Sequence, residues 1–312
     1  MHFPFLIHIT KHKDTILFMM ISKKPQKQQN FKSNNNNNSN TDSRLQIKKF
    51  NPVVLSDKIA SDASPVICII GKRNTGKSEV IRSLLYYNKN IPSGIVISPT
   101  EMGNKFYGSF CPDSFIHHHF DPELLGRVMT RQRRRVSKYG KIFKNNLFMI
   151  LDDCMYDSKE VCGNKHIKEI FCNGRHFQIT IVVTAQYVMD LPVALRSNID
   201  YVFCMRENNV ANIERLYRSF FGIFPTKYSF SQALSTVTEN YGSIMCDNLS
   251  RSNKIDECVY WFRALYPCPS FRMGSAKYWN FHDNFYDNNH QSHDNDDDDK
   301  TQVNSDIPLL IS

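Results

Sequence analysis

The chain has 312 residues, of which 41% are hydrophobic, so it is long enough to bury a sizeable core. Its formal net charge is +9 in spite of an acidic stretch near the C-terminus, which favours a polyanionic partner for the basic remainder. The apolar runs are shorter than the roughly 18 residues of a membrane-spanning helix, and the nine scattered cysteines contain no Cys-x-x-Cys pair, which indicates a reducing compartment and argues against a disulfide framework or a zinc site.

The first 49 residues are predicted to form a disordered or low-complexity arm. Residues 21–46 are rich in Asn, Gln and Lys, and they contain too little apolar surface to offset the entropy lost on ordering. The segment before them mixes apolar and basic residues and lacks the pattern of a signal peptide. We hypothesise that translation starts at Met19 or Met20.

Residues 50–266 have the pattern of one α/β domain. Short runs that are apolar on both faces alternate with helical stretches, which is typical of a doubly wound, mainly parallel sheet. Strands are predicted at Val66–Ile70, Gly94–Ser98, Leu147–Leu151, Ile179–Val183 and Tyr201–Met205, with further edge strands at 242–246 and 257–264. Helices are predicted at 76–87, 210–220 and 230–238. Residues 267–312 are predicted to be a C-terminal segment with an acidic, disordered tail.

The first predicted strand runs into a glycine-flanked loop that opens the next helix. This pattern is typical of a site for nucleotide phosphates, because the two glycines allow successive amide N–H groups to turn inward around the β-phosphate. A lysine supplies positive charge, and a hydroxyl supplies a ligand for Mg²⁺. The predicted nucleotide-binding residues are Gly71, Lys72, Arg73, Asn74, Thr75, Gly76, Lys77 and Ser78.

Two acidic residues follow the strand Leu147–Leu151, at the edge of the sheet where such folds bind ligands. Asp152 is the expected Mg²⁺ partner together with Ser78, and Asp153 is the candidate base or water-orienting group. Gln186 follows the next strand and is the candidate that senses the terminal phosphate and holds the attacking water. The sequence therefore predicts Mg²⁺ as cofactor and a nucleoside triphosphate, ATP, as substrate.

Two arginines flank the strand that precedes Gln186. Arg175 comes before it and Arg196 after it, and either side chain is a candidate for stabilising transition-state charge at a neighbouring subunit's terminal phosphate. Arg175 is preferred because it is closer in sequence to that strand.

A basic stretch between residues 127 and 144 contains no acid. It is either a surface that contacts a nucleic-acid backbone or a solubilising helix face, and the sequence favours neither. Its members are Arg127, Arg131, Arg133, Arg134, Arg135, Lys138, Lys141 and Lys144.

Two other motifs are interpreted as coincidental. Residues 253–256 match a guanine-reading motif, but no apolar strand precedes them, so a polar turn is expected. Residues 117–119 are three consecutive histidines, which point in different directions and lack further ligands.

Five blocks of the sequence occur in the order shown by a known family. They are Gly71–Ser78, the strand ending in Asp152-Asp153, Asn173–His176, Thr184–Gln186 and Leu195–Phe203. Together they resemble the poxvirus-type genome-packaging ATPases of nucleocytoplasmic large DNA viruses, a branch of the FtsK/HerA superfamily of P-loop ATPases. The resemblance covers about residues 50 to 265.

The resemblance implies a P-loop domain with an additional strand between the Walker A loop and the Walker B acids, for which Gly94–Ser98 is the match. It implies a homo-oligomer, usually a hexameric ring, that moves double-stranded DNA into a capsid, with capsid or portal-like proteins as partners. The expected location is the host cytoplasm (virus factory), with the virion as a second location. It also implies that Gln186 is the sensor and that Arg175, with Arg196 second, is an arginine finger acting in trans. Much of the superfamily has Glu at the position of Asp153.

Three other functions are considered as alternatives to a DNA-packaging motor. One is a HerA-like or secretion-type DNA translocase, and another is a switch or scaffold that binds ATP without pumping. A small-molecule P-loop kinase would need an acceptor pocket, for which only the unspecific basic stretch is available. Asp153, Gln186 and a trans arginine favour the motor because all of them serve turnover.

Overall fold

A computed structural model describes residues 5–12, 14–22, 44–61 and 63–286. One eleven-stranded sheet runs through this part of the chain, in the order β1-β2-β3-β11-β10-β9-β4-β8-β7-β5-β6. The strands are β1 (Phe5–His12), β2 (Thr15–Ser22), β3 (Arg44–Lys49), β4 (Val66–Ile70), β5 (Ser93–Ile97), β6 (Ile116–His117), β7 (Leu147–Leu151), β8 (Ile179–Ala185), β9 (Tyr201–Cys204), β10 (Gly242–Asp247) and β11 (Val259–Arg263). From β9 to β6 the strands are parallel, and β10 is antiparallel to both of its neighbours.

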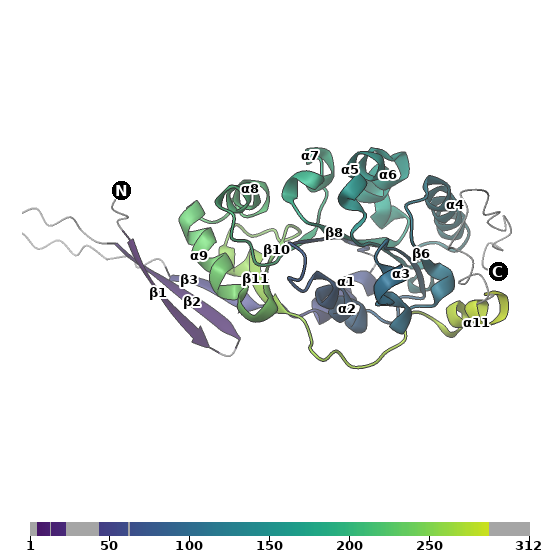
Figure 1. Ribbon diagram of the computed structural model, residues 1–312, viewed down its shortest axis with the longest axis horizontal. Helices are drawn as coiled ribbons and strands as arrows, with labels where there is room; N and C mark the ends of the chain where they lie inside the picture. The colour runs from purple at the N-terminus through teal and green to yellow at the C-terminus, as the bar shows by residue number, and fades with distance from the viewer. Residues whose placement is uncertain (1–4, 13, 23–43, 62, 287–312) are drawn as a thin grey trace, which may run out of the picture.

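Helices cover both faces of the sheet. Figure 1 shows α4 to α8 on one face and α1 and α2 on the other. The helices are α1 (Val53–Ala60), α2 (Lys77–Tyr87), α3 (Glu101–Asn104), α4 (Pro122–Tyr139), α5 (Ser158–Gly163), α6 (Lys165–Asn173), α7 (Val193–Arg196), α8 (Val210–Phe220), α9 (Lys227–Val237), α10 (Ile255–Cys258) and α11 (Ala276–Phe285). None of these described helices is both long and apolar enough to cross a bilayer.

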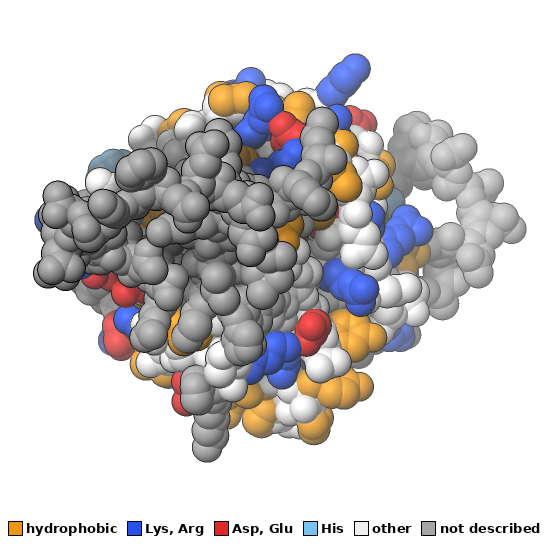
Figure 2. Space-filling view, turned by 90° about the vertical axis from the view of Figure 1, so that its left-hand side faces the viewer, with side chains coloured by type: hydrophobic (Ala, Val, Ile, Leu, Met, Phe, Trp, Pro, Cys, Tyr) orange, Lys and Arg blue, Asp and Glu red, His pale blue; other side chains and the backbone are white. Residues whose placement is uncertain are grey.

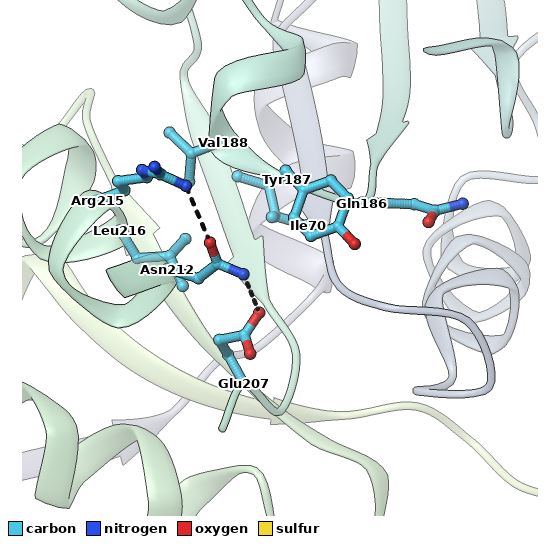
Figure 3. Close-up of a pocket in the computed structure, with 8 residues that line it drawn as sticks. All are labelled: Ile70, Gln186, Tyr187, Val188, Glu207, Asn212, Arg215 and Leu216. Carbon is cyan, nitrogen blue, oxygen red and sulfur yellow. Dashed lines mark hydrogen bonds between the residues drawn. The ribbon is translucent and has the colours of Figure 1, made fainter. Parts of the chain in front are cut away.

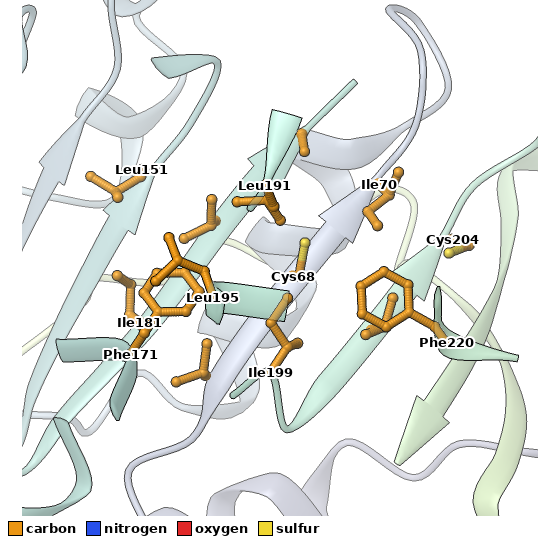
Figure 4. Packing of buried hydrophobic residues seen from close by; sticks show 14 of the residues in the cluster. Cys68, Ile70, Leu151, Phe171, Ile181, Leu191, Leu195, Ile199, Cys204 and Phe220 are labelled. Carbon is orange, nitrogen blue, oxygen red and sulfur yellow. The ribbon is translucent and has the colours of Figure 1, made fainter. Parts of the chain in front are cut away.

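The central strand β4 is buried along its whole length. Cys68 and Ile70 belong to the hydrophobic cluster under α6 and α8, part of which is shown in Figure 4. Ile67 and Ile69 belong to the cluster under α1 and α2. Because alternate residues of a strand point to opposite faces, burial on both faces produces the continuous apolar run seen in the sequence.

The predicted doubly wound fold is confirmed, and the central strands lie within two residues of their predicted bounds. The additional strand β5 does come between β4 and β7 along the chain. In the sheet, however, the strand between β4 and β7 is β8. The second edge strand starts at Val259 rather than at residue 257, since residues 255–258 form α10.

The prediction of a disordered arm is wrong for the described residues 5–12, 15–22 and 44–49. These form β1, β2 and β3, of which β2 pairs with both others and β3 pairs with the edge strand β11. Ile16 and Ile47 are buried in this extension. The reason for the error is that a strand obtains its hydrogen bonds from a distant partner, here β11, which composition does not reveal. Residues 1–4, 13 and 23–43 lie outside the described residues, so the rest of that prediction and the alternative start stay predictions.

The end of the molecule that carries this hairpin has a mixed surface. Where described atoms are visible in Figure 2, Lys and Arg side chains are scattered among hydrophobic and acidic ones. On the described surface visible in this view, the Lys and Arg side chains therefore do not gather into one positive patch.

The chain after β11 is also ordered further than predicted. Leu265 donates its N–H to Ser83 Oγ of α2 at 2.8 Å, and the Phe271 ring stacks on Phe110 with 4.9 Å between centroids. Figure 1 shows this segment crossing beneath α2 to α11 at the far side of the sheet. Residues 264–285, which we call the strap, therefore hold α2 against the domain. The predicted domain boundary at residue 266 is too early. Residues 287–312, which contain the acidic tail, lie outside the described residues.

Tyr278 anchors the strap and provides a test of it. Its side chain is 2% exposed, its hydroxyl donates to the Gly94 carbonyl at 2.8 Å, and its ring packs against Phe115. We expect Tyr278→Ala to lower the free energy of unfolding by about 3–5 kcal/mol, as for other buried aromatic truncations. Tyr278→Phe loses only the hydrogen bond and should cost about 1 kcal/mol. Urea unfolding of the full chain measures both, and equal stability of wild type and the Ala variant would contradict an anchoring role.

Candidate functional site

The loop between β4 and α2 approaches its neighbours closely. A Cβ on Gly71 would lie 2.6 Å from the Cβ of Met205 and 2.7 Å from Thr75 Oγ1, so only glycine fits there. Thr75 Oγ1 donates to the Lys72 carbonyl at 2.7 Å, and Gly76 caps α2 with a left-handed φ of 94°. The loop therefore turns back on itself at the positive end of an α-helix, which is the arrangement that binds phosphate groups.

Lys77 places a buried ammonium at this loop. Its side chain is 7% exposed, and Nζ donates to the carbonyls of Gly71 at 2.9 Å and of Lys72 at 3.2 Å. The same Nζ lies 4.0 Å from Asp153 Oδ1. The structure thus brings the predicted phosphate-binding lysine and one predicted catalytic acid into one site.

Asp152 is held in a fixed orientation at the end of β7. Its carboxylate is buried and accepts hydrogen bonds from Thr184 Oγ1 and from the Tyr107 hydroxyl, each at 2.8 Å. Burial raises the pKa of Asp152, and the charge of Asp153 adds to this shift, whereas the two hydrogen bonds and Lys77 oppose it. The hydrogen bonds therefore favour the ionised form that a metal-binding role requires.

Asp153 has a left-handed backbone, with φ of 53°. Such a conformation is uncommon outside glycine and is often found at functional sites. Its backbone N–H donates to Thr184 Oγ1 at 2.9 Å. The Thr184 hydroxyl therefore hydrogen-bonds both to the backbone of Asp153 and to the carboxylate of Asp152. The carboxylate of Asp153 is 30% exposed, which leaves it open to water and substrate.

Thr184 and Tyr107 were not predicted as site residues. Thr184 reaches the acids because β8 lies between β4 and β7 in the sheet. The sequence does contain a signal for Thr184, because it is a polar residue near the end of an otherwise apolar strand. Tyr107 comes from the short helix η1 (Tyr107–Ser109), and its backbone N–H donates to the buried carboxylate of Glu101 at 2.9 Å. No pattern in the sequence relates this segment to Asp152.

Gln186 lies at the same edge, directly after β8. It lines a small cavity whose other walls are Ile70, Tyr187, Val188, Glu207, Asn212, Arg215 and Leu216. Figure 3 shows the Gln186 amide pointing away from Glu207 and Asn212. The position of Gln186 is therefore consistent with the predicted sensor, while its role stays a prediction.

A chain of polar contacts connects the phosphate-binding loop to α8. Lys72 Nζ lies 2.6 Å from Glu207 Oε1, Asn212 Nδ2 donates to Glu207 Oε2 at 3.1 Å, and Arg215 Nη1 donates to Asn212 Oδ1 at 3.2 Å. The last two bonds are visible in Figure 3. Burial acts to raise the pKa of Glu207, but hydrogen bonds from Lys72 and from the Asn209 N–H bring it below the ordinary value of 4.5. Glu207 was not predicted as a site residue.

This shift gives a pH-dependent prediction for Glu207→Gln. A carboxyl group whose pKa is lowered by folding contributes stability above its unfolded pKa, and the contribution is lost as the pH falls through the folded pKa. We expect the variant to be less stable than wild type by about 1 kcal/mol at pH 7. The difference should vanish as the pH is lowered below 4.5. Thermal unfolding across this range tests it, and a pH-independent difference would contradict the contribution of the ionised group.

The two candidate arginines lie in different parts of the domain. Arg175 belongs to η5 (Gly174–His176), ahead of β8, so it sits at the amino edge of the parallel strands, opposite the phosphate-binding loop. Arg196, at the end of α7, donates to Ser219 Oγ of α8 at 3.3 Å. The structure does not bring Arg175 to the loop of its own chain, and an action in trans stays a prediction.

The basic stretch forms most of α4 and the loop after it. Arg127 pairs with Asp121 at 3.6 Å, Arg133 pairs with Glu169, and Arg131 donates to Ser93 Oγ at 3.3 Å. Part of its charge is therefore used within the domain, and a contact of the stretch with nucleic acid stays a prediction.

The donor atoms at the loop fit a magnesium ion. Ser78 and Asp152 would provide oxygen ligands, and Mg²⁺ typically uses one or two carboxylates together with substrate phosphates and water. Among the described residues there is no group of three or more His, Cys, Asp or Glu side chains that suits a metal ion. Burial lowers the pKa of His117 to about 4, which favours the neutral form of this histidine. All the cysteines are free, and most are buried.

Comparison with known proteins relates the chain to large DNA viruses. The sequence profile of the family described as Poxvirus A32 protein matches residues 57–247. An uncharacterized protein of Acanthamoeba polyphaga mimivirus is 33% identical over 228 residues, which cover 71% of this chain and 80% of that protein. An uncharacterized protein of Invertebrate iridescent virus 3 is 34% identical over 239 residues, covering 75% and 90%. Among solved structures, the genome packaging NTPase B204 from Sulfolobus turreted icosahedral virus 2, in complex with AMPPCP, matches with a TM-score of 0.46 and 15% identity over 65% of this chain and 98% of that one.

Proposed function

This chain belongs to the poxvirus A32 protein family, and from this membership and the site geometry we propose that it is an Mg²⁺-dependent ATPase that moves double-stranded DNA into a viral capsid. The observation that carries the proposal is the 4.0 Å approach of Lys77 Nζ to Asp153 Oδ1, beside the anchored Asp152. A phosphate-binding loop that faces two acids of a neighbouring strand has the parts needed for hydrolysis as well as for binding.

Each residue has a distinct task in this proposal. The loop amides and Lys77 bind the β- and γ-phosphates, and Ser78 and Asp152 hold the magnesium ion, which neutralises phosphate charge when bound. Asp153 orients the attacking water and accepts its proton, since its carboxylate is exposed and faces the loop. Gln186 aligns the same water, and Arg175 of a neighbouring subunit stabilises the charge that develops on the terminal phosphate.

The finer parts of the proposal concern assembly and partners. We place the protein in the cytoplasm of the infected host cell, as a ring of identical subunits that acts on DNA together with capsid or portal-like proteins. The net charge of +9 supports a polyanionic partner. The location of Arg175 away from its own loop supports sites completed by a second subunit.

The proposal is tested by the rate of ATP hydrolysis with increasing double-stranded DNA at several salt concentrations. A DNA-driven motor should be stimulated by DNA, and the stimulation should weaken as salt rises because phosphate contacts are screened. Tight ATP binding without turnover, with or without DNA, would contradict a motor and would favour a nucleotide switch.

A further inference from the structure

A large aromatic side chain stands exposed beside the phosphate-binding loop. Tyr241 is the last residue of η7 (Glu239–Tyr241), and it is 69% exposed. A Cβ on Gly76 would lie 3.4 Å from Tyr241 Cδ1, so the ring reaches the residue that precedes Lys77. Tyr241 belongs to neither hydrophobic cluster of the described residues. Core packing therefore does not account for an aromatic residue here.

The backbone of this turn is strained. Asn240 and Tyr241 both have a left-handed conformation, with φ of 51° and 58°. Asn tolerates that conformation, whereas a bulky residue such as Tyr adopts it rarely. A turn selected only for its shape would carry Gly, Asn or Asp at residue 241. The choice of Tyr therefore indicates a task for its side chain.

The surrounding structure holds the turn in place. The next residue, Gly242, passes so close to α9 that a Cβ on it would lie 2.0 Å from the Val237 carbonyl oxygen. Arg263 Nη2 donates to the Glu239 carbonyl at 3.2 Å, and Lys11 Nζ of the N-terminal hairpin lies 2.5 Å from Glu239 Oε2. These contacts fix Tyr241 at the loop, as a preformed ligand site requires.

The topology of the sheet decides which part of a nucleotide would meet this ring. The order β10-β9-β4-β8-β7 puts the loop after β4 in the middle, with Asp152 and Asp153 two strands away on one side. Since β10 is antiparallel to β9, its first residue, Gly242, lies at the edge where β9 ends, two strands away on the other side. A nucleotide whose terminal phosphate points to the two acids therefore directs its base toward Tyr241.

We propose that Tyr241 stacks on the adenine of the bound nucleotide and so forms the base subsite of this ATPase. The inference rests on the proposed function, because it takes the loop after β4 as the phosphate site. A phenol ring beside an exposed loop offers an apolar face to a base, and stacking of this kind adds affinity without needing base-specific hydrogen bonds.

The test compares two ligands that share their phosphates and differ in the base. MgATP and inorganic tripolyphosphate with Mg²⁺ are titrated into the full chain by calorimetry. Tyr241→Ala should weaken ATP binding about tenfold and leave tripolyphosphate binding unchanged, while Tyr241→Phe should bind both as wild type does. Wild-type affinity for ATP in Tyr241→Ala, or an equal loss for both ligands, would overturn the base subsite.

A second variant separates stacking from folding. Tyr241→Gly relieves the left-handed strain, so it should melt at or above the temperature of wild type and still bind ATP as weakly as Tyr241→Ala. Wild-type ATP affinity in this well-folded variant would also overturn the inference. Tyr139→Ala, which removes another partly exposed tyrosine at the end of α4, is the matched control and should leave ATP affinity unchanged.

The result for Lys77→Ala distinguishes a failure of the subsite from a failure of the proposed function. If this variant loses both ligands while Tyr241→Ala keeps both, the phosphate site stands and the base subsite is wrong. If Lys77→Ala binds both ligands like wild type, the phosphate site itself is wrong, and the inference about Tyr241 is overturned with it.

Discussion

Lys77→Ala is expected to weaken binding of ADP or ATP by about 100-fold and to abolish ATP turnover. The ammonium is buried and makes two hydrogen bonds to loop carbonyls, so it is positioned before any phosphate arrives. A hydrogen bond that involves a charged group is worth about 1.5–3 kcal/mol, and the variant removes the charge that would contact two phosphate groups. Calorimetric titration with MgADP measures the affinity without interference from hydrolysis.

The matched control is Lys72→Ala in the same loop. Lys72 is more exposed, and its Nζ is paired with Glu207 rather than buried against the loop. We expect its removal to change ADP affinity by less than about threefold, since a phosphate is held by the backbone N–H groups of the loop, which the substitution keeps. If Lys77→Ala bound ADP as tightly as Lys72→Ala, the loop would not be a phosphate site.

Asp153→Asn is expected to preserve nucleotide binding and to lower kcat by about 10²–10⁴, the usual contribution of a general base. The substitution is almost isosteric, and Asn accepts the left-handed backbone of this position, so the hydrogen bond from its N–H to Thr184 should persist. What is lost is the negative charge that polarises water. Steady-state rates, together with ADP affinity, separate the loss of chemistry from a loss of binding.

Asp157→Asn is the matched control for this prediction. Asp157 caps α5 by accepting the Glu160 N–H at 3.2 Å, and Asn is an equally good cap, so the rate should stay at the wild-type value. Equal ATPase rates in wild type and Asp153→Asn would contradict the role proposed for Asp153. Weak ADP binding by that variant would show that Asp153 acts on binding instead.

The sequence predicted the core of the fold because the signals involved are local. A strand buried on both faces must be apolar throughout, so β4, β7 and β9 could be recognised as short uninterrupted runs. The phosphate-binding loop is likewise a contiguous segment whose glycines and lysine act within a few residues of one another. The candidate residues Lys77, Asp152 and Asp153 could be predicted for the same reason, since each lies at the end of such a strand or loop.

Only the tertiary structure decided which elements meet. The position of β8 between β4 and β7 lets Thr184 hydrogen-bond to both Asp152 and Asp153. This order of strands in the sheet cannot be predicted from the sequence of any one strand. Tyr107 and Tyr241 come from the short helices η1 and η7, whose placement depends on packing against distant segments. The strands β1 to β3 and the strap after β11 were missed because their stability comes from partners far away in the sequence, whereas composition reports only what a segment can bury by itself.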